Sequence, residues 1–404
     1  MALIHPDEAW RRIAERVRPL AEASVGRREA AGRVLARPLA ATVDVPASDV
    51  SAMDGYAVTG ELQPEEARPV AGTVFAGDRP GFEIPPGAVA RIMTGAPVPA
   101  AADRVIPVEL TDGGRERVTF HKGVPPGEHV RRRGEVLRTG DPLLPAGALL
   151  TPGALALLAT HGYGEVPIHH VPTVAVMATG DEVVPPEEVP APGQLRDSNT
   201  DFLLAAGATL GLRFDPLGIA PDRVDALRER VGEGLRSHVL LLCGGVSMGE
   251  FDFVEGVLAD FGCEAVFDAV AIQPGKPVVF ATHPGGIVFG LPGNPASVMV
   301  SFWLFVRPAL RRLLGFADSW WGPALRGTLA APLPGAGPRD RFLPAAVEAR
   351  EGEILVTPHA FKGSHDLAAF SLGTALVRVR AGAEPAAAGE RCEVLVVAAG
   401  GGGL

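Results

Sequence analysis

Cysteine is scarce in this chain. Its 404 residues include only three cysteines, Cys243, Cys263 and Cys392, and no CxxC spacing. Three cysteines cannot all pair, and the isolated positions lack the pattern of a zinc site, so the sequence argues against a disulfide framework and against cysteine-bound zinc. We interpret the three as small buried apolar side chains, which is the usual state of free cysteines.

Long apolar runs are also missing. The longest membrane-like run, Val298–Val306, falls far short of the roughly 20 residues that cross a bilayer. The N-terminal sequence MALIHPDEAWRRIAERV is amphipathic and charged, and it has no apolar stretch of the kind found in signal peptides. We therefore expect a cytoplasmic protein that does not associate with a membrane.

Positive charge is the third shortage. The chain carries 37 Lys and Arg residues against 47 Asp and Glu residues, a formal net charge of -10. This balance argues against nucleic-acid binding, and an anionic ligand must therefore be held by a local basic cluster. One run presents three consecutive guanidinium groups, Arg131, Arg132 and Arg133. A solvated charged surface is the commoner meaning of such a run, and the alternative is a phosphate clamp made of planar guanidinium forks.

Glycine and proline, by contrast, are plentiful. The 50 glycines and 38 prolines predict many turns and few long helices, and the length predicts about two to four domains. Helical spacing predicts a docking helix within His5–Val25, and Thr151 with Pro152 predicts the start of a second helix that runs to Thr160. Between them, Arg68–Val136 has short strands separated by turns. We expect a small β domain inserted into a scaffold that contains both helices.

From Pro172 onward, short apolar strands alternate with helices. This alternation predicts a mostly parallel sheet with helices on both faces, a doubly wound three-layer α/β domain. The expected strands are Val174–Met177, Phe214–Ile219, His238–Leu242, Ala265–Ile272 and Ile287–Phe289. A buried helix over 295–314, kinked at Pro308, follows them. After Gly315, Pro/Gly-rich sequence with short strands predicts a C-terminal β-barrel or sandwich.

Three segments of this α/β domain follow directly after predicted strands. They are 179–182, 244–249 and 291–297. Because the carboxyl ends of parallel strands meet at one edge of a sheet, we expect these segments to form a ligand site there. The predicted helix caps nearby are Ser198, Asp222 and Asn294. The predicted domains are 1–42 with 137–170, 43–136, 171–318 and 319–404.

The segment after the central strand has the features of an anion site. Gly244 and Gly245 permit positive φ and let a phosphate approach the backbone. A helix that opens near Ser247–Glu250 would point its N–H groups at that phosphate. Glu250 and Asp252 stand beside this cradle. They either bind a cation such as Mg²⁺ that bridges to the phosphate or stabilise the helix dipole.

Seven motifs together resemble one known family. In chain order they are VPASDVSAMDGYAV, IMTGAPVPAAAD, VRRRGE, ATGDEVV, GGVSMGEFD, IQPGKPV and GLPGNPAS. The chain resembles the molybdopterin molybdenumtransferase family, which includes MoeA and the gephyrin E-domain. Each motif alone is weak, but the ordered combination is specific. The resemblance implies four domains and a homodimer, in which the β domain of one subunit helps to close the site of the other.

The chemistry implied by this resemblance is the last step of molybdenum cofactor assembly. Molybdate enters the dithiolene of adenylylated molybdopterin, and AMP leaves as the pyrophosphate link is hydrolysed with Mg²⁺. The resemblance assigns catalytic roles to Asp54, Thr94, Glu182, Asp222 and Asp252, and Mg²⁺ binding to Glu182 and Asp252. It assigns the binding of pterin phosphate, cofactor or molybdate to Gly244, Gly245, Ser247, Gly249, Lys276, Pro277, Pro292, Asn294, Ser297, Arg131, Arg132, Ser364 and Arg341.

Some positions depart from the family pattern. Val136 stands where an acid is frequent, and Gln273 stands where lysine is common, which removes one positive charge beside the expected molybdate site. Ala368 and Ala369 stand where serines are frequent. Beyond the two small-molecule substrates, the implied partners are molybdopterin adenylyltransferase and molybdoenzyme chaperones.

Two other functions are compatible with parts of the chain. Molybdopterin adenylyltransferase resembles the α/β domain, but that activity needs only a single domain. A non-catalytic molybdopterin-binding scaffold is the second alternative, as in the gephyrin branch. The acids Asp54, Glu182 and Asp252 favour catalysis, because a scaffold has no need of clustered carboxylates.

Overall fold

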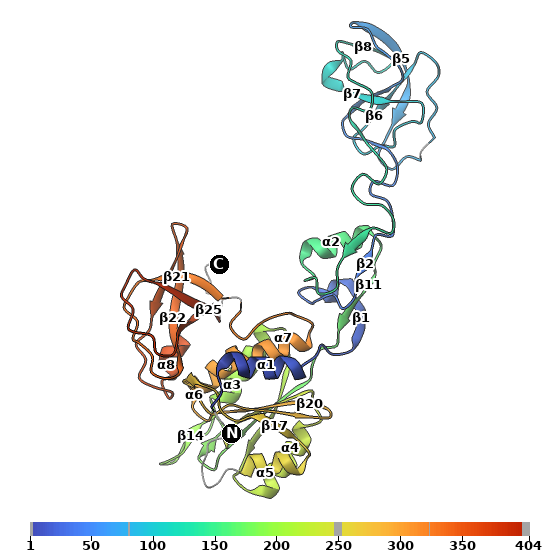
Figure 1. The fold of residues 1–404 in the computed structure, drawn as a ribbon. Helices are drawn as coiled ribbons and strands as arrows, with labels where there is room; N and C mark the ends of the chain where they lie inside the picture. The colour runs from blue at the N-terminus through green and yellow to red at the C-terminus, as the bar shows by residue number, and fades with distance from the viewer. Residues whose placement is uncertain (1–2, 80, 246–252, 323, 398–404) are drawn as a thin grey trace. The chain divides into compact units, whose positions relative to one another are not determined.

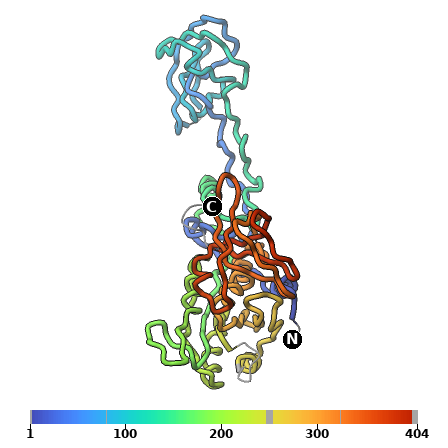
Figure 2. The backbone as a smooth tube through the Cα atoms, turned by 90° about the vertical axis from the view of Figure 1, so that its left-hand side faces the viewer, coloured from blue at the N-terminus to red at the C-terminus, as the bar shows by residue number. Residues whose placement is uncertain are grey.

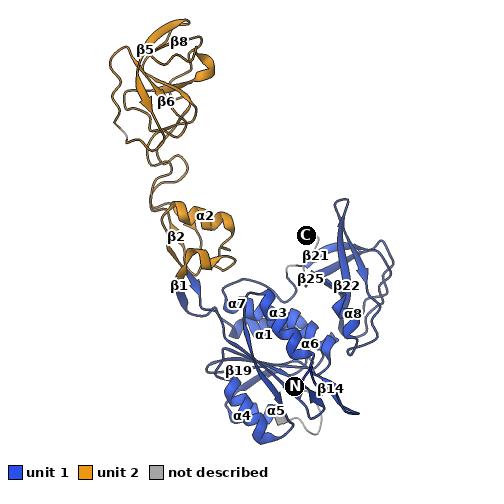
Figure 3. Ribbon diagram, turned by 180° about the vertical axis from the view of Figure 1, so that it is seen from behind, with its two compact units in different colours: residues 1–23, 167–404 blue, residues 24–166 orange. Residues whose placement is uncertain are grey.

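The computed structural model describes residues 3–79, 81–245, 253–322 and 324–397. The chain forms two compact units, one made of Met1–Ala23 with Pro167–Leu404 and the other of Ser24–Val166 (Figure 3). The second unit is therefore an insertion in the sequence of the first. Each unit has hydrophobic cores of its own.

The first unit is built on a six-stranded sheet with the order β15-β12-β16-β20-β19-β17 (Figure 1). Its strands are β12 (Val174–Thr179), β15 (Phe214–Ala220), β16 (Val239–Cys243), β17 (Glu264–Phe267), β19 (Val279–His283) and β20 (Gly286–Leu291). Strands β15, β12, β16 and β20 are parallel, and β19 pairs antiparallel with both of its neighbours. Every residue of β12 and β16 is buried, as expected for strands covered on both faces.

Helices cover both faces of this sheet. Val174 and Val176 of β12 pack in one core, and Ala175 and Met177 pack in another, because successive side chains of a strand point to opposite faces. The first core includes α1, α3, α6 and α7, and the second includes α4 and α5. These helices are α1 (Pro6–Arg16), α3 (Asn199–Thr209), α4 (Val224–Gly234), α5 (Phe253–Asp260), α6 (Pro295–Ser301) and α7 (Arg307–Leu313). The predicted doubly wound three-layer α/β fold is confirmed.

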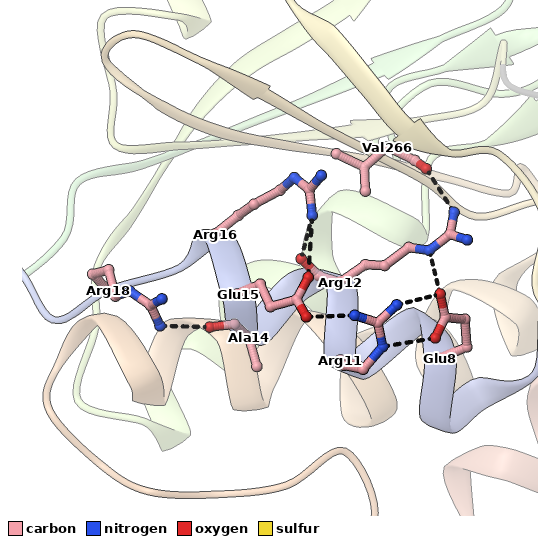
Figure 4. Close-up of polar contacts among 8 residues, drawn as sticks. All are labelled: Glu8, Arg11, Arg12, Ala14, Glu15, Arg16, Arg18 and Val266. Atoms are coloured by element: carbon pink, nitrogen blue, oxygen red, sulfur yellow. Dashed lines mark hydrogen bonds and ion pairs between the residues drawn. The ribbon is translucent and has the colours of Figure 1, made fainter.

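Helix α1 buries an apolar face and exposes a charged one. Ala9 and Ile13 are fully buried. On the outer face, arginine and glutamate side chains pair along the helix, and Arg12 donates to the carbonyl oxygen of Val266 at 3.3 Å (Figure 4). The helix is shorter than the predicted segment because Pro19 disfavours helical backbone in the residue before it.

The long helix predicted over 295–314 is instead three pieces. Helix α6 is followed by a π-helical turn, Phe302–Val306, and then by α7. The expected kink at Pro308 is replaced by this wider turn. Proline has no N–H for the carbonyl four residues earlier, and its ring clashes with that carbonyl, so the turn before it opens.

The predicted strand over 265–272 is wrong. The structure divides it into β17 and β18 (Ile272–Gln273), and β18 pairs with a strand of the C-terminal barrel. The sequence analysis also missed β19. Strands β19 and β20 form an antiparallel hairpin through His283–Gly286, and a hairpin needs no helix between its strands, so the strand–helix alternation could not reveal it.

The C-terminal strands close into a barrel, as predicted. They are β21 (Ala324–Leu329), β22 (Asp340–Arg350), β23 (Glu353–Pro358), β24 (Ala375–Val379) and β25 (Arg391–Val396). The ring closes because β22 pairs with β24 along its first half and with β23 along its second. Figure 2 shows the backbone of these C-terminal strands at the red end of the colour scale. A short helix that the sequence analysis missed, α8 (Leu367–Ser371), contacts α6.

The second unit contains a five-stranded sheet with the order β7-β4-β6-β5-β8. Its strands are β4 (Gly55–Val58), β5 (Glu66–Val74), β6 (Val89–Ile92), β7 (Arg104–Pro107) and β8 (Arg117–Phe120). The remaining short elements outside the two sheets and the barrel include α2 (Pro152–Thr160), β1 (Glu22–Gly26), β2 (Leu39–Ala40), β3 (Val50–Ser51), β9 (Val130–Arg131), β10 (Pro142–Leu144) and β11 (Glu165–His169). Thr151 caps α2 as predicted, because its side chain accepts the N–H of Ala154 at 3.2 Å. The small β domain is therefore confirmed as part of an inserted segment.

The cysteines confirm only part of the expectation that all three are buried apolar side chains. All three cysteines are free; Cys243 is buried, and Cys263 and Cys392 are half-buried. Burial raises the pKa of each thiol above its ordinary value. In the described part of the chain, no helix has both the length and the apolar character needed to cross a bilayer.

Candidate active site

The candidate site lies at a topological switch point of the six-stranded sheet. From β12 the chain passes to β15 on one side, and it then crosses to β16 on the other side of β12. Loops that leave neighbouring strands in opposite directions open a crevice at the strand ends, where sheets of this kind bind ligands. Ala178 of β12 and Cys243 of β16 are register partners beside this crevice.

The turn after β16 depends on its two glycines. Gly244 has φ +94° and Gly245 has φ +65°, so both adopt the backbone region that the sequence analysis expected. A Cβ on Gly244 would lie 2.7 Å from the carbonyl oxygen of Thr179, and a Cβ on Gly245 would lie 2.8 Å from Cγ2 of Val254. The turn can therefore pass this close to Thr179 and Val254 only because neither position has a side chain.

A cavity of about 600 Å³ opens over these strand ends. Its walls come from the segments after β12, β16 and β20, from the segment before α3, and from the loop before α8. The structure thus brings the described parts of the three strand-end segments together. The candidate residues that line the cavity are Glu182, Asp222, Gly244, Gly245, Pro277, Pro292 and Asn294.

Acidic side chains gather at one end of this cavity. Glu182 is exposed and Asp222 is half-buried. Burial raises the pKa of the Asp222 carboxyl, and the nearby carboxylates of Asp181 and Glu182 raise it further. The expected cap of α4 by Asp222 is wrong: Arg223 holds the N-cap position without a side-chain bond, and the backbone N–H of Asp222 donates to Oδ1 of Asp181 at 3.1 Å.

Asp197 also lines the cavity, and the sequence analysis missed it. Ser198 occupies the N-cap position of α3 without a side-chain bond. The buried Asp197 instead accepts the N–H groups of Asn199 and Thr200 at 3.1 and 3.0 Å. Nδ2 of Asn199 donates to the carbonyl oxygen of Gly293 at 2.8 Å. These bonds tie the start of α3 to the loop that precedes α6.

Other candidate residues of the first unit lie outside the cavity lining. Lys276 is exposed, and Ser297 is buried in α6. Arg341 pairs in strand register with Gln273, and its guanidinium donates to the carbonyl oxygen of Gly335 at 3.4 Å. The carbonyl oxygen of Ser364 accepts the N–H of Ala296 in the first turn of α6 at 3.1 Å. The remaining candidates, Ser247, Gly249 and Asp252, and also Glu250, lie outside the described residues.

The second unit holds the other candidates. Oδ1 of Asp54 accepts hydrogen bonds from the backbone N–H and the hydroxyl of Thr94, at 2.6 and 2.7 Å. These bonds hold the pKa of Asp54 below its ordinary range. Arg131 is exposed on β9, whereas Arg132 forms an ion pair with Asp49 at 2.6 Å.

The cationic lining of the cavity was not found from the sequence. Arg196 of β14 (Leu195–Arg196), which pairs with β13 (Val183–Val184), lines it together with His365 from the loop before α8. Neither residue belongs to the three segments that the sequence analysis placed directly after strands of the sheet. For His365 a signal was nevertheless present, because it follows Ser364 directly in a segment that already resembled a family loop.

Comparisons with known proteins identify the family. Models of the MoeA N-terminal region (domain I and II), a probable molybdopterin binding domain and the MoeA C-terminal region (domain IV) match residues 4–162, 175–312 and 326–397. A molybdopterin molybdenumtransferase of Nostoc sp. is 37% identical over 345 residues, 83% of this chain and 78% of that protein. One of Bacillus subtilis is 32% identical over 402 residues, 97% of this chain and 93% of that protein. The chain belongs to the molybdopterin molybdenumtransferase family.

Solved structures agree with this membership. The molybdopterin biosynthesis MoeA protein of Pyrococcus horikosii is 30% identical, with a TM-score of 0.83 over 99% of this chain and 100% of that chain. A molybdenum cofactor biosynthesis protein of Pyrococcus furiosus, 19% identical with a TM-score of 0.60, supports the fold alone. As a member of the molybdopterin molybdenumtransferase family, this chain is a transferase, so the enzyme class that the motifs implied is confirmed.

Proposed function

We propose that this protein inserts molybdate into the dithiolene of adenylylated molybdopterin, in a Mg²⁺-dependent reaction that releases AMP. The observation that carries the proposal is the cavity at the switch point of the sheet, in a chain of this family. Gly244 and Gly245 leave room for an anion to approach the backbone. A cavity of about 600 Å³ has the size of a small-molecule site.

Carboxylates supply the acid–base chemistry in this proposal. Glu182, Asp222 and Asp252 act from the first unit, and Asp54 acts with Thr94 from the second. The two hydrogen bonds from Thr94 keep Asp54 ionised at neutral pH. An ionised carboxylate can accept the proton of the water that hydrolyses the pyrophosphate link, and AMP is then the leaving group.

Mg²⁺ suits the oxygen donors proposed for it. Magnesium binds through one or two carboxylates together with phosphate oxygens rather than in an all-protein cage. The residues that the structure describes contain no group of three His, Cys, Asp or Glu side chains placed to hold a metal. Glu182, exposed at the cavity, and Asp252 would hold the ion. Its charge would offset that of the phosphates.

Substrate binding is assigned to residues around the same cavity and in the second unit. Lys276 and an arginine are the proposed hosts of the molybdate dianion, because charge-assisted hydrogen bonds are the strongest available to an oxyanion. The other proposed binding residues are Gly244, Gly245, Ser247, Gly249, Pro277, Pro292, Asn294, Ser297, Arg131, Arg132, Ser364 and Arg341.

We extend the proposal to the assembly. The active form is a cytoplasmic homodimer, with the β domain of one subunit closing the site of the other. The proposal includes four domains, which are 1–42 with 137–170, 43–136, 171–318 and 319–404. Molybdopterin adenylyltransferase supplies the substrate, and molybdoenzyme chaperones receive the product.

A single-turnover assay tests the reaction. Purified protein is mixed with adenylylated molybdopterin and Mg²⁺, with and without molybdate, and AMP is measured. Molybdate-dependent release is the expected result. Glu182→Gln should slow it by at least about 10²-fold. Glu187→Gln, a nearby acid that follows β13 and lies outside the cavity lining, should not. Binding without release would instead indicate a scaffold, and release of pyrophosphate from ATP would indicate an adenylyltransferase.

A further inference from the structure

The charge of the described cavity wall is mostly negative. Its acidic lining residues are Glu182, Asp197 and Asp222, and its basic ones are Arg196 and His365. A ligand that carries phosphates is repelled by the three carboxylates unless cations offset them. The two basic side chains are therefore the described lining groups best suited to contact a phosphate.

His365 reaches the cavity from the C-terminal barrel. The residue before it, Ser364, accepts the N–H of Ala296 at 3.1 Å through its carbonyl oxygen. Pro295, which precedes Ala296, has no N–H to offer. The loop therefore covers the start of α6, and the next residue, His365, is exposed on the wall of the cavity.

Hydrogen bonds hold this loop in one conformation. The carboxylate of Asp366 accepts the N–H of Lys362 at 3.0 Å and that of Ala369 at 3.1 Å. The N–H of Asp366 donates to the carbonyl oxygen of Gly363 at 2.9 Å. Gly363 has φ +136°, which a residue with a side chain rarely adopts. A loop that is already ordered loses little entropy when a ligand binds to it.

Arg196 is held at the same wall from a different element. Its Nε donates to the carbonyl oxygen of Glu188 at 3.0 Å. This bond orients the guanidinium without neutralising it, because a carbonyl carries no net charge. Arg196 thus brings positive charge to the cavity from β14, and both Arg196 and His365, the latter from the barrel loop, bring N–H donors.

We propose that His365 is a phosphate-binding residue of this site, and that it donates an imidazole N–H to a phosphate oxygen of the substrate. The identity of that substrate rests on the proposed function, whereas the position of His365 does not. An imidazole has at least one N–H in either protonation state, so it can donate at neutral pH. The C-terminal barrel then takes part directly in substrate recognition.

Calorimetric titration with AMP and with adenosine tests this role, because the two probes differ only in the phosphate. His365→Ala should weaken AMP binding by about tenfold or more, the usual effect of losing a hydrogen bond to a charged group. Adenosine binding should not change. His365→Asn keeps an N–H donor and should restore part of the AMP affinity. Lys362→Ala is the matched control, since this exposed side chain is on the same loop outside the cavity lining.

Three results would overturn the proposal: unchanged AMP affinity in His365→Ala, an equal loss for AMP and adenosine, or wild-type protein with no preference for AMP over adenosine. Molybdate-dependent AMP release, measured on the same preparations, separates this inference from the proposed function. If AMP is released in the presence of molybdate but His365→Ala binds AMP as tightly as wild type, only this inference is rejected. If His365→Ala weakens AMP binding as expected but molybdate causes no AMP release, only the proposed reaction is rejected.

Discussion

Gly245 occupies a position that tolerates no side chain. Its φ is +65°, and an added Cβ would lie 2.8 Å from Val254 and 2.9 Å from Oγ1 of Thr179. Gly245→Ala should therefore lower the free energy of unfolding by at least about 1 kcal/mol. Gly256→Ala is the control, because Gly256 lies in α5 with open space around its Cα, where alanine should be neutral or stabilising. Equal urea midpoints for the two variants would contradict the steric argument.

Asp222 should make stability depend on pH. Burial raises its pKa in the native state, so the folded protein binds a proton at this site more tightly than the unfolded chain does. Stability should fall as the pH rises from about 4, the unfolded carboxyl value, through the higher native pKa, and the penalty should persist at neutral pH.

Asp222→Asn removes this titration. The melting temperature of the variant, relative to wild type, should be higher at about pH 7 than at about pH 4, while AMP release decreases if Asp222 acts in catalysis. A difference in melting temperature that stays constant between the two pH values would rule out the burial effect.

Capping by Asp197 decides how α3 begins. Its buried carboxylate accepts the N–H groups of Asn199 and Thr200. Asp197→Ala should lower the free energy of unfolding by about 0.5–2 kcal/mol, the usual loss for an N-cap, as measured by denaturant titration. Asp201→Ala removes an exposed acid from the same first turn and serves as the control. If the two losses were equal, helix-dipole electrostatics rather than capping would explain both.

Asp44 joins two extended segments of the second unit. It accepts the N–H of Thr139 at 2.8 Å and pairs with Arg133 at 2.5 Å. The hydrogen bond from the N–H of Thr139 contributes most, and together these contacts lower the pKa of Asp44 to about 2. The carboxylate is therefore charged at neutral pH, and the link persists. Arg132 pairs with Asp49 in the same way. Two of the three consecutive arginines thus bind acids of their own unit.

Asp44→Ala should loosen the backbone at this link. Hydrogen–deuterium exchange should become faster at the amide of Thr139, which loses its acceptor, and at that of Val136, which donates to the carbonyl oxygen of Val45 next to Asp44. As a control, Asp78→Ala removes a more exposed carboxylate of the same unit, which accepts the N–H of Phe75. Unchanged exchange at Thr139 in Asp44→Ala would show that the two segments are held by other contacts.

A buried ion pair holds the first unit together over long sequence distances. Arg378 of the barrel contacts Asp340 at 2.6 Å, with 8% and 2% of their side chains exposed. The N–H of Asp340 donates to the carbonyl oxygen of Ala271, before β18. The guanidinium lies 4.6 Å from the ring of Trp320, whose indole N–H donates to Asp7 of α1 at 2.7 Å. Helix α1, the segment before β18 and the barrel are therefore linked through a few side chains.

Arg378→Met should leave a buried, uncompensated carboxylate and cost about 3–5 kcal/mol of unfolding free energy. Adding Asp340→Asn removes that charge and should recover part of the loss. Arg380→Met breaks the more exposed pair with Glu393 and should cost no more than about 1 kcal/mol. Denaturant titration measures all three, and a double variant less stable than Arg378→Met would contradict the charge argument.

Local patterns in the sequence were sufficient for the fold class, although not for every element. Apolar runs followed by glycines identified β12, β16 and β20, because strands covered on both faces must be apolar throughout. Gly244 and Gly245 indicated positive φ, since only glycine adopts it at no steric cost. The order of the motifs was sufficient for the family. In each case the physical cause lies within a few neighbouring residues.

Contacts between distant segments were decided only by the tertiary structure. Strand β18 joins the barrel, and His365 enters the cavity wall. Neither follows from local propensity, because each depends on which distant segments come together once the sheet and the barrel have formed. The sequence by itself determined the central buried strands and the family, because their patterns are local; the folded chain determined which residues from distant segments surround the site.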